Sequence, residues 1–253
     1  MIPASFRLEG RCALVTGAGR GLGQAMAIAL AEAGVDVAGV YVTDIEETRA
    51  RVQAAGRRFT AIEQDLRGPA AARHVVEHAA EAMGRLDILV NNAGIIRRAD
   101  SIDFTEADWD DVIDVNLKSV FFLAQAAARR FLAQGGGGKI VNVASMLSFQ
   151  GGVRVPSYTA SKSGVLGLTR LLANEWAAKG INVNAIAPGY MATANTAPLR
   201  ADATRSAEIL ARIPAGRWGR PEDLAGAVVF LCSSASDYVH GSVIAVDGGW
   251  LAR

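Results

Sequence analysis

The sequence predicts an α/β fold with a doubly wound parallel sheet of about seven strands and helices on both faces. Short apolar runs alternate with longer helical segments along the whole chain of 253 residues. The runs are almost continuously apolar, which is typical of parallel strands that are covered on both sides. No linker-like or low-complexity segment interrupts the alternation, so we expect residues 1–253 to form a single domain.

Local signals place each element in turn. Pro69 begins an expected helix and Gly84 ends it, and four glycines at 135–138 end a long helix. Apolar runs bounded by glycine or polar residues give the strands. The expected strands are residues 12–16, 35–42, 59–63, 86–90, 139–144, 181–187 and 243–246. The expected helices are residues 24–33, 45–55, 69–83, 106–133, 157–178, 201–212 and 221–233.

Composition excludes several classes of protein. The 26 basic and 25 acidic residues give a net charge of +1 without a basic block, which argues against nucleic acid or an anionic membrane as partner. Apolar stretches stay far below the roughly 20 residues of a membrane span. The first ten residues contain no apolar signal-peptide core, and Cys12 and Cys232 are lone and far apart. We therefore expect a cytoplasmic protein with free thiols and, from the histidine spacing, no metal site.

A tyrosine and a lysine four residues apart are the first candidate catalytic groups. Tyr158 and Lys162 fall on one face of the helix that Pro156 begins. A free phenol has a pKa of about 10, and we expect the neighbouring ammonium to lower it toward the range useful for acid–base catalysis. Ser145, at the end of a strand, can hold a substrate oxygen against the phenol. Alone, this spacing is a weak signal, since tyrosine and lysine often meet so by chance.

Glycines follow the first strand, where it meets the first helix. The spacing Gly17-x-x-x-Gly21-x-Gly23 differs from the usual dinucleotide fingerprint but allows a tight turn and close approach to a pyrophosphate at the helix N-terminus. Asn92-Ala93-Gly94 follows the fourth strand, at the switch point where doubly wound sheets bind ligands. Each segment can also be read as a plain turn, but their positions favour dinucleotide binding.

Together, the glycine turn, the Asn-Asn-Ala-Gly turn, and Ser145, Tyr158 and Lys162 resemble the short-chain dehydrogenase/reductase family over essentially the whole chain. The resemblance implies a Rossmann-like fold, a nicotinamide cofactor and a homotetramer. It implies a catalytic role for Asn116, in a water-mediated proton relay, beside Ser145, Tyr158 and Lys162. The implied cofactor-binding residues are Gly17, Arg20, Gly21, Leu22, Gly23, Asp44, Asp65, Leu66, Asn92, Ala93, Gly94, Tyr158, Lys162, Pro188, Gly189 and Thr193.

Five further stretches are similar to members of the family that act on deoxy sugar acids. They are residues 91–98, 145–162, 187–193, 213–218 and 247–253. The similarity implies hydride transfer between NAD(H) and a ketone or secondary alcohol, in uronate breakdown. A sugar acid needs a partner for its carboxylate, and arginine suits that role. The candidate substrate-binding residues are Ser145, Gln150, Arg154 and Arg98.

The sequence leaves alternatives open for both the cofactor and the substrate class. Asp44 after the second strand, with no arginine close behind that strand, favours NAD over NADP. Arg20 in the glycine turn can favour NADP, so NADP stays open. A reductase of 3-oxoacyl thioesters would share every catalytic motif. A non-catalytic dinucleotide-sensing regulator would share the fold, but it would be expected to have lost catalytic positions that are all present here.

Overall fold

Seven parallel strands form one sheet in the computed structural model, which describes residues 4–253. The strand order is β3-β2-β1-β4-β5-β6-β7, so the chain winds outward from β1 in one direction and from β4 in the other. This arrangement confirms the predicted fold class and places the switch point between β1 and β4. The strands are β1 (Cys12–Thr16), β2 (Asp36–Tyr41), β3 (Phe59–Glu63), β4 (Ile88–Asn91), β5 (Gly138–Val143), β6 (Ile181–Pro188) and β7 (Val243–Val246).

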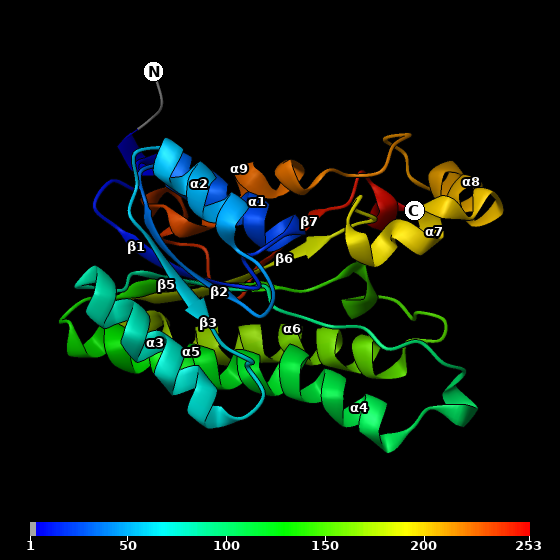
Figure 1. Ribbon diagram of the computed structural model, residues 1–253, viewed down its shortest axis with the longest axis horizontal. Helices are drawn as coiled ribbons and strands as arrows, with labels where there is room; N and C mark the ends of the chain where they lie inside the picture. Colours follow the sequence, from blue (N-terminus) through cyan, green and yellow to red (C-terminus); the bar gives the residue numbers. More distant parts are fainter. Residues whose placement is uncertain (1–3) are drawn as a thin grey trace.

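Helices cover both faces of the sheet (Figure 1). One layer holds α3 (Pro69–Met83), α4 (Glu106–Ile113), α5 (Ser119–Ala133) and α6 (Pro156–Trp176). The other holds α1 (Gly21–Glu32), α2 (Glu46–Ala54) and α9 (Ala225–Cys232). The short helices α7 (Ala197–Ala201) and α8 (Ala203–Arg212) lie apart from both layers, at the end of the molecule where Figure 1 also places the last residues.

Short single-turn helices join these elements. A π-helical segment, η3 (Asp114–Lys118), lies between α4 and α5. The 3-10 turns are η1 (Ala4–Phe6), η2 (Ser101–Asp103), η4 (Met146–Ser148), η5 (Ala177–Lys179), η6 (Ala194–Thr196), η7 (Pro221–Leu224), η8 (Ser234–Ser236) and η9 (Trp250–Ala252).

Three expected helices are divided in the structure. The helix expected over residues 221–233 begins as the 3-10 turn η7 and continues as α9. The long helix expected over residues 106–133 is interrupted by the π segment. The sequence did not reveal this π turn, because buried residues continue at helical spacing on both sides of it.

The helix expected over residues 201–212 begins at Ala203, and a separate α7 precedes it. Asp202 has extended backbone, and its side chain accepts a hydrogen bond from the Arg205 N–H at 3.0 Å. A capping aspartate therefore starts a new helix at this point.

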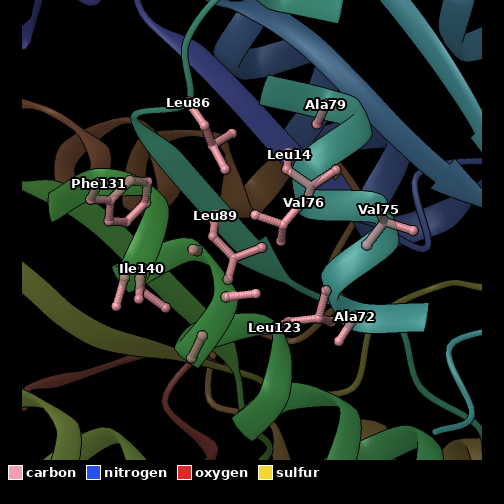
Figure 2. Packing of buried hydrophobic residues seen from close by; sticks show 14 of the residues in the cluster. Leu14, Ala72, Val75, Val76, Ala79, Leu86, Leu89, Leu123, Phe131 and Ile140 are labelled. Atoms are coloured by element: carbon pink, nitrogen blue, oxygen red, sulfur yellow. The ribbon is translucent and has the colours of Figure 1, made fainter. Parts of the chain in front are cut away.

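Each face of the sheet has its own apolar core because successive strand residues point to opposite sides. Leu14 and Leu89 pack against Val75 and Val76 of α3 on one face, together with residues of α5 (Figure 2). Val15, next to Leu14, belongs to the core on the other face with residues of α1 and α9. All these side chains are buried, which fixes strands and helices relative to each other.

A chain of buried polar side chains runs beneath the carboxyl ends of the central strands. Asn91 Nδ2 donates to Asn142 Oδ1 at 2.9 Å, and Asn142 Nδ2 donates to Thr169 Oγ1 at 3.0 Å. Thr169 donates in turn to the Val165 carbonyl of its own helix. The three side chains thus join β4, β5 and α6 by hydrogen bonds inside an otherwise apolar layer.

The cysteines, the possible metal ligands and the apolar helices of residues 4–253 each bear on an expectation from the sequence. Cys12 and Cys232 are free and buried, and burial raises the pKa of Cys232 to about 12. Residues 4–253 hold no cluster of histidine, cysteine and carboxylate side chains that could bind a metal ion. In the same range no helix combines the length and apolar character that crossing a membrane requires.

Candidate active site

Ser145, Tyr158 and Lys162 meet where β5 ends and α6 begins. Ser145 follows β5 and caps the turn η4, where its hydroxyl accepts a hydrogen bond from the Leu147 N–H at 3.2 Å. Tyr158 and Lys162 lie in the first turns of α6, with the lysine Nζ 5.7 Å from the centre of the tyrosine ring. The structure therefore brings the three predicted catalytic side chains together.

Burial dominates the electrostatics of this group. It raises the pKa of Tyr158, while a hydrogen bond with the Ser145 side chain and the positive charge of Arg98 act in the opposite direction. Burial also lowers the pKa of Lys162 to about 8. The pKa of the phenol thus moves opposite to the expected direction, and the groups that oppose desolvation are Ser145 and Arg98 rather than Lys162. Lys162 Nζ instead donates to the Val143 carbonyl at 2.7 Å, which fixes its position.

Asn116 lies in the π segment and is fully buried. Its side chain bonds both backbone groups of Ile95, accepting from the N–H at 2.8 Å and donating to the carbonyl at 2.9 Å. Its amide also lies 3.4 Å from the Ser161 hydroxyl, one residue before Lys162. Asn116 therefore joins the loop after β4 to the catalytic helix. π turns inside helices are frequent at functional sites.

The glycine turn is built for close backbone contact. Gly17 and Gly21 have φ angles of +65° and +58°, which favour glycine. A Cβ on Gly23 would lie 2.1 Å from the Gly17 carbonyl oxygen, so a side chain there would displace the turn. Arg20, the residue before α1, makes no side-chain cap, which leaves the first N–H groups of the 12-residue helix to an anion. The turn fits a pyrophosphate.

Asn92 supports this turn rather than lying free beside it. Its side-chain amide donates to the carbonyls of Thr16 and Gly17 at 2.9 and 3.2 Å. The Thr16 hydroxyl accepts from the N–H groups of Asn92 and Ala93, both at 3.0 Å. Gly94 follows, and a Cβ there would lie 3.3 Å from Asn116 Oδ1. Asn92 thus holds the glycine turn in place through hydrogen bonds to its backbone.

Two of the expected cofactor-binding residues, Asp44 and Asp65, lie in the loops after β2 and β3. Asp44 is exposed, its carbonyl approaches Gly19, and its carboxylate accepts from the Glu46 N–H at 3.0 Å. Asp65 is exposed and ion-paired with Arg67, whereas Leu66 is buried in the core. Leu22 is half-buried in the first turn of α1. Both carboxylates therefore have partners within the protein.

The loop after β6 carries the residues expected at the nicotinamide. Pro188 ends β6, and the Gly189 N–H donates to the Val246 carbonyl at 2.9 Å. A Cβ on Gly189 would lie 2.5 Å from the Asp247 Cα, so only glycine fits. The methyl carbon of Thr193 would lie 3.7 Å from a Cβ on Gly21, which places this loop against the glycine turn.

The three predicted substrate-binding residues other than Ser145 differ in the partners that their side chains have within the protein. Arg98 is exposed, donates to the Asn195 carbonyl at 3.3 Å and lies near enough to influence the pKa of Tyr158. Arg154 has a φ of +63° and pairs with Asp100 at 3.0 Å. Gln150 accepts a hydrogen bond from Arg212, a residue that the sequence analysis did not single out. Arg98 is therefore the best placed of the predicted cations.

Two further residues near Ser145 were not predicted from the sequence. Trp250 is buried against Met146, next to Ser145, and Arg212 lies over its ring. Both are far from the catalytic motif in sequence, so spacing gives no signal for them. The one available signal was that Trp250 falls in a stretch that resembles sugar-acid enzymes.

Comparison with known proteins agrees with this geometry. Residues 17–251 match the family described as enoyl-(acyl carrier protein) reductase. The chain is 64% identical to 2-dehydro-3-deoxy-D-gluconate 5-dehydrogenase of Escherichia coli (strain K12), with 100% of both chains covered. A crystal structure from Agrobacterium tumefaciens with bound NADP, provisionally assigned as a 2-deoxy-D-gluconate 3-dehydrogenase, is 61% identical.

That structure has a TM-score of 0.94, and the match covers 99% of this chain and 100% of the other. A gluconate 5-dehydrogenase of Burkholderia cenocepacia, in complex with NADP and tartrate, is 40% identical, with a TM-score of 0.92 and 98% of each chain covered. Motifs, sheet order and site geometry agree with these relatives. The chain belongs to the short-chain dehydrogenase/reductase family of NAD(P)-dependent oxidoreductases.

Proposed function

We propose that the protein interconverts a ketone and a secondary alcohol on a deoxy sugar acid of the 2-dehydro-3-deoxy-D-gluconate type. The single observation that supports this most is the exposed cation near the phenol: Arg98 lies close enough to act on the pKa of Tyr158. A carboxylate on the substrate can bind there while its hydroxyl or keto oxygen reaches the catalytic pair. The 64% identity to a 2-dehydro-3-deoxy-D-gluconate 5-dehydrogenase supports the same class.

The reaction follows from the positions of three side chains. The nicotinamide, when bound, supplies or accepts the hydride. In the reducing direction, the Ser145 hydroxyl hydrogen-bonds the substrate carbonyl oxygen and Tyr158 donates its proton to that oxygen as negative charge develops. The raised pKa of Tyr158 keeps the phenol protonated and ready to donate. Lys162, held on the Val143 carbonyl, places an ammonium beside the phenolate that remains.

Asn116 has a supporting part in this proposal. Its side chain is committed to the backbone of Ile95 and lies near Ser161, so it fixes the distance between the loop after β4 and α6. Reprotonation of Tyr158 needs a path to solvent. The proposed relay through water beside Asn116 supplies that path.

The choice between NAD and NADP also belongs to the proposal. Asp44, which favours NAD, has its carboxylate on the Glu46 N–H, and Arg20, which favours NADP, is exposed at the start of α1. We keep NAD as the preferred cofactor and expect measurable use of NADP. Assembly as a homotetramer stays a prediction from the family resemblance, and a cytoplasmic location stays a prediction from the first ten residues and the lone cysteines.

Turnover of a small substrate panel tests the function. Purified protein is mixed with NADH or NADPH and a 2,5-diketo-3-deoxy sugar acid, a neutral ketose or an acetoacetyl thioester, and absorbance of the reduced nicotinamide is followed. We expect fast turnover of the sugar acid alone. Turnover of the thioester alone would establish the rival 3-oxoacyl reductase. Dinucleotide binding without turnover of any carbonyl compound would favour the regulator.

A further inference from the structure

Helix α8 is attached to the loop after Ser145 by an arginine that lies on a tryptophan ring. The guanidinium carbon of Arg212 is 4.0 Å from the centre of the Trp250 ring, and Arg212 Nη2 donates to Gln150 Oε1 at 3.2 Å. We propose that Arg212, stacked on Trp250, is a positioning residue that holds α8 against the loop after Ser145 and so sets the affinity for substrate. The proposal rests on the sugar-acid function and adds two residues to its site.

Packing joins the ring to the loop after Ser145 itself. Trp250 is 5% exposed and belongs to a cluster with Met146, Ile209 and Ile213. Met146 directly follows Ser145, and Ile209 is the buried residue of α8. A shift of α8 would therefore displace side chains that pack directly beside the serine. The position of α8 therefore affects the position of Ser145, the side chain proposed to hydrogen-bond the substrate oxygen.

The same ring also touches the loop expected at the nicotinamide. The Tyr190 ring lies 4.7 Å from Trp250 and 5.6 Å from Trp218, centre to centre. Tyr190 directly follows Gly189, whose backbone is fixed on Val246. Trp250 thus contacts both loops that border the site, the one after β5 and the one after β6.

Two hydrogen bonds to backbone carbonyls join the end of α8 and the residues after it to the C-terminal segment. Arg253 Nη2 donates to the Ala211 carbonyl at 2.7 Å, and the Ala215 N–H donates to the Gly248 carbonyl at 3.0 Å. Cations near the last carbonyls of a helix are favourable. Figure 1 shows α7 and α8 beside the last residues of the chain. The segment 248–253 therefore acts as the fixed support, and Arg212 as the link from α8 to that support.

The chemistry of the contact allows a sharp substitution series. A cation binds the face of an aromatic ring but gains nothing comparable from an aliphatic side chain. Trp250 Nε1 is buried without a hydrogen-bond partner among the described residues. Trp250→Phe therefore keeps the π face and loses no hydrogen bond, whereas Trp250→Leu keeps apolar packing and loses the π face.

Steady-state kinetics with the full chain test the proposal. Arg212→Ala and Trp250→Leu should raise KM for the sugar acid about three- to tenfold, and Trp250→Phe should stay within about twofold of wild type. All variants should keep the dissociation constant for NADH within about twofold. Arg205→Ala is the matched control, since Arg205 lies on the same helix but pairs outward with Glu208. Equal effects of Phe and Leu at position 250 would overturn the role of the stacked cation.

Hydrogen exchange separates this proposal from the proposed function. The amides of Ala203–Arg212 should exchange faster in Arg212→Ala and Trp250→Leu than in wild type, Trp250→Phe or Arg205→Ala. This measurement needs no substrate. If the wild type fails to turn over the sugar acid, the proposed function fails, while exchange still decides whether Arg212 holds α8. Unchanged exchange in both disruptive variants would refute the positioning role, whatever the substrate.

Discussion

The buried ammonium of Lys162 lowers the stability of the folded protein, and Lys162→Met tests that cost. Burial takes the pKa from 10.5 to about 8, and each pKa unit is worth about 1.36 kcal/mol. The charged lysine therefore costs the folded state about 3 kcal/mol at neutral pH. Methionine removes the charge but deprives the Val143 carbonyl of its 2.7 Å donor, which costs about 1–2 kcal/mol. The variant should be about 1–2 kcal/mol more stable at pH 7 and inactive.

The pH dependence gives the sign of the effect. The folded pKa is depressed, so the cost is complete below about pH 8 and disappears as the pH rises from about 8 toward 10.5. In that window the unfolded chain binds more protons than the folded protein, so the free energy of unfolding of the wild type rises with pH relative to that of the variant. The order should reverse between about pH 9 and pH 10, where the remaining cost of the charge falls below the roughly 1–2 kcal/mol of the lost hydrogen bond.

Urea unfolding followed by circular dichroism measures both effects. Wild type and variant are compared at equal protomer concentration and without added dinucleotide, since a ligand or partner subunit that binds the folded state shifts the midpoint. Lys179→Met is the matched control, because Lys179 is exposed in the turn after α6. A destabilised Lys162→Met variant at pH 7, or a difference from wild type that does not change with pH, would refute the reasoning.

Kinetic predictions concern four other candidate residues. Tyr158→Phe should lower kcat by at least about 10²-fold and leave dinucleotide binding intact, as measured by turnover and fluorescence titration; near-normal activity would disprove its role. Arg20→Ala should raise KM for NADPH about tenfold with little effect on NADH, and equal effects on both would exclude a contact with the 2′-phosphate. Arg98→Ala should raise KM about tenfold for the sugar acid but not for a neutral ketose. Arg154→Ala should do less, since Asp100 already pairs with Arg154; the reverse order would exchange their roles.

The arrangement of strands was predictable because burial on both faces leaves a direct trace in the sequence. The strand Cys12–Thr16 is apolar up to its last residue, and the structure buries all of it. The π segment at Asp114–Lys118 leaves no such trace, since its residues continue the apolar pattern of the helices around it. The start of α8 depended on the capping geometry of Asp202, a signal that the helical composition of the segment concealed.

The candidate site was predictable where its parts are close in the chain. Tyr158 and Lys162 share a helix face, so spacing alone brings them together. The direction in which the pKa of Tyr158 moves depends on how many protein atoms surround the phenol, which no local pattern reveals. The contact between Gln150 and Arg212 joins residues 62 positions apart. Such a contact follows from the tertiary fold and is invisible to motif reading.

The buried chain from Asn91 through Asn142 to Thr169 has a consequence for how this protein can evolve. Losing one member leaves a polar partner without its hydrogen bond in an apolar layer, at about 1–3 kcal/mol, whereas replacing partners together by apolar groups of similar shape can be nearly neutral. We therefore expect single substitutions at these positions to be selected against, and joint replacement of all three to be tolerated. Aligned relatives should show the three positions varying as a set, with amide and hydroxyl retained together or lost together.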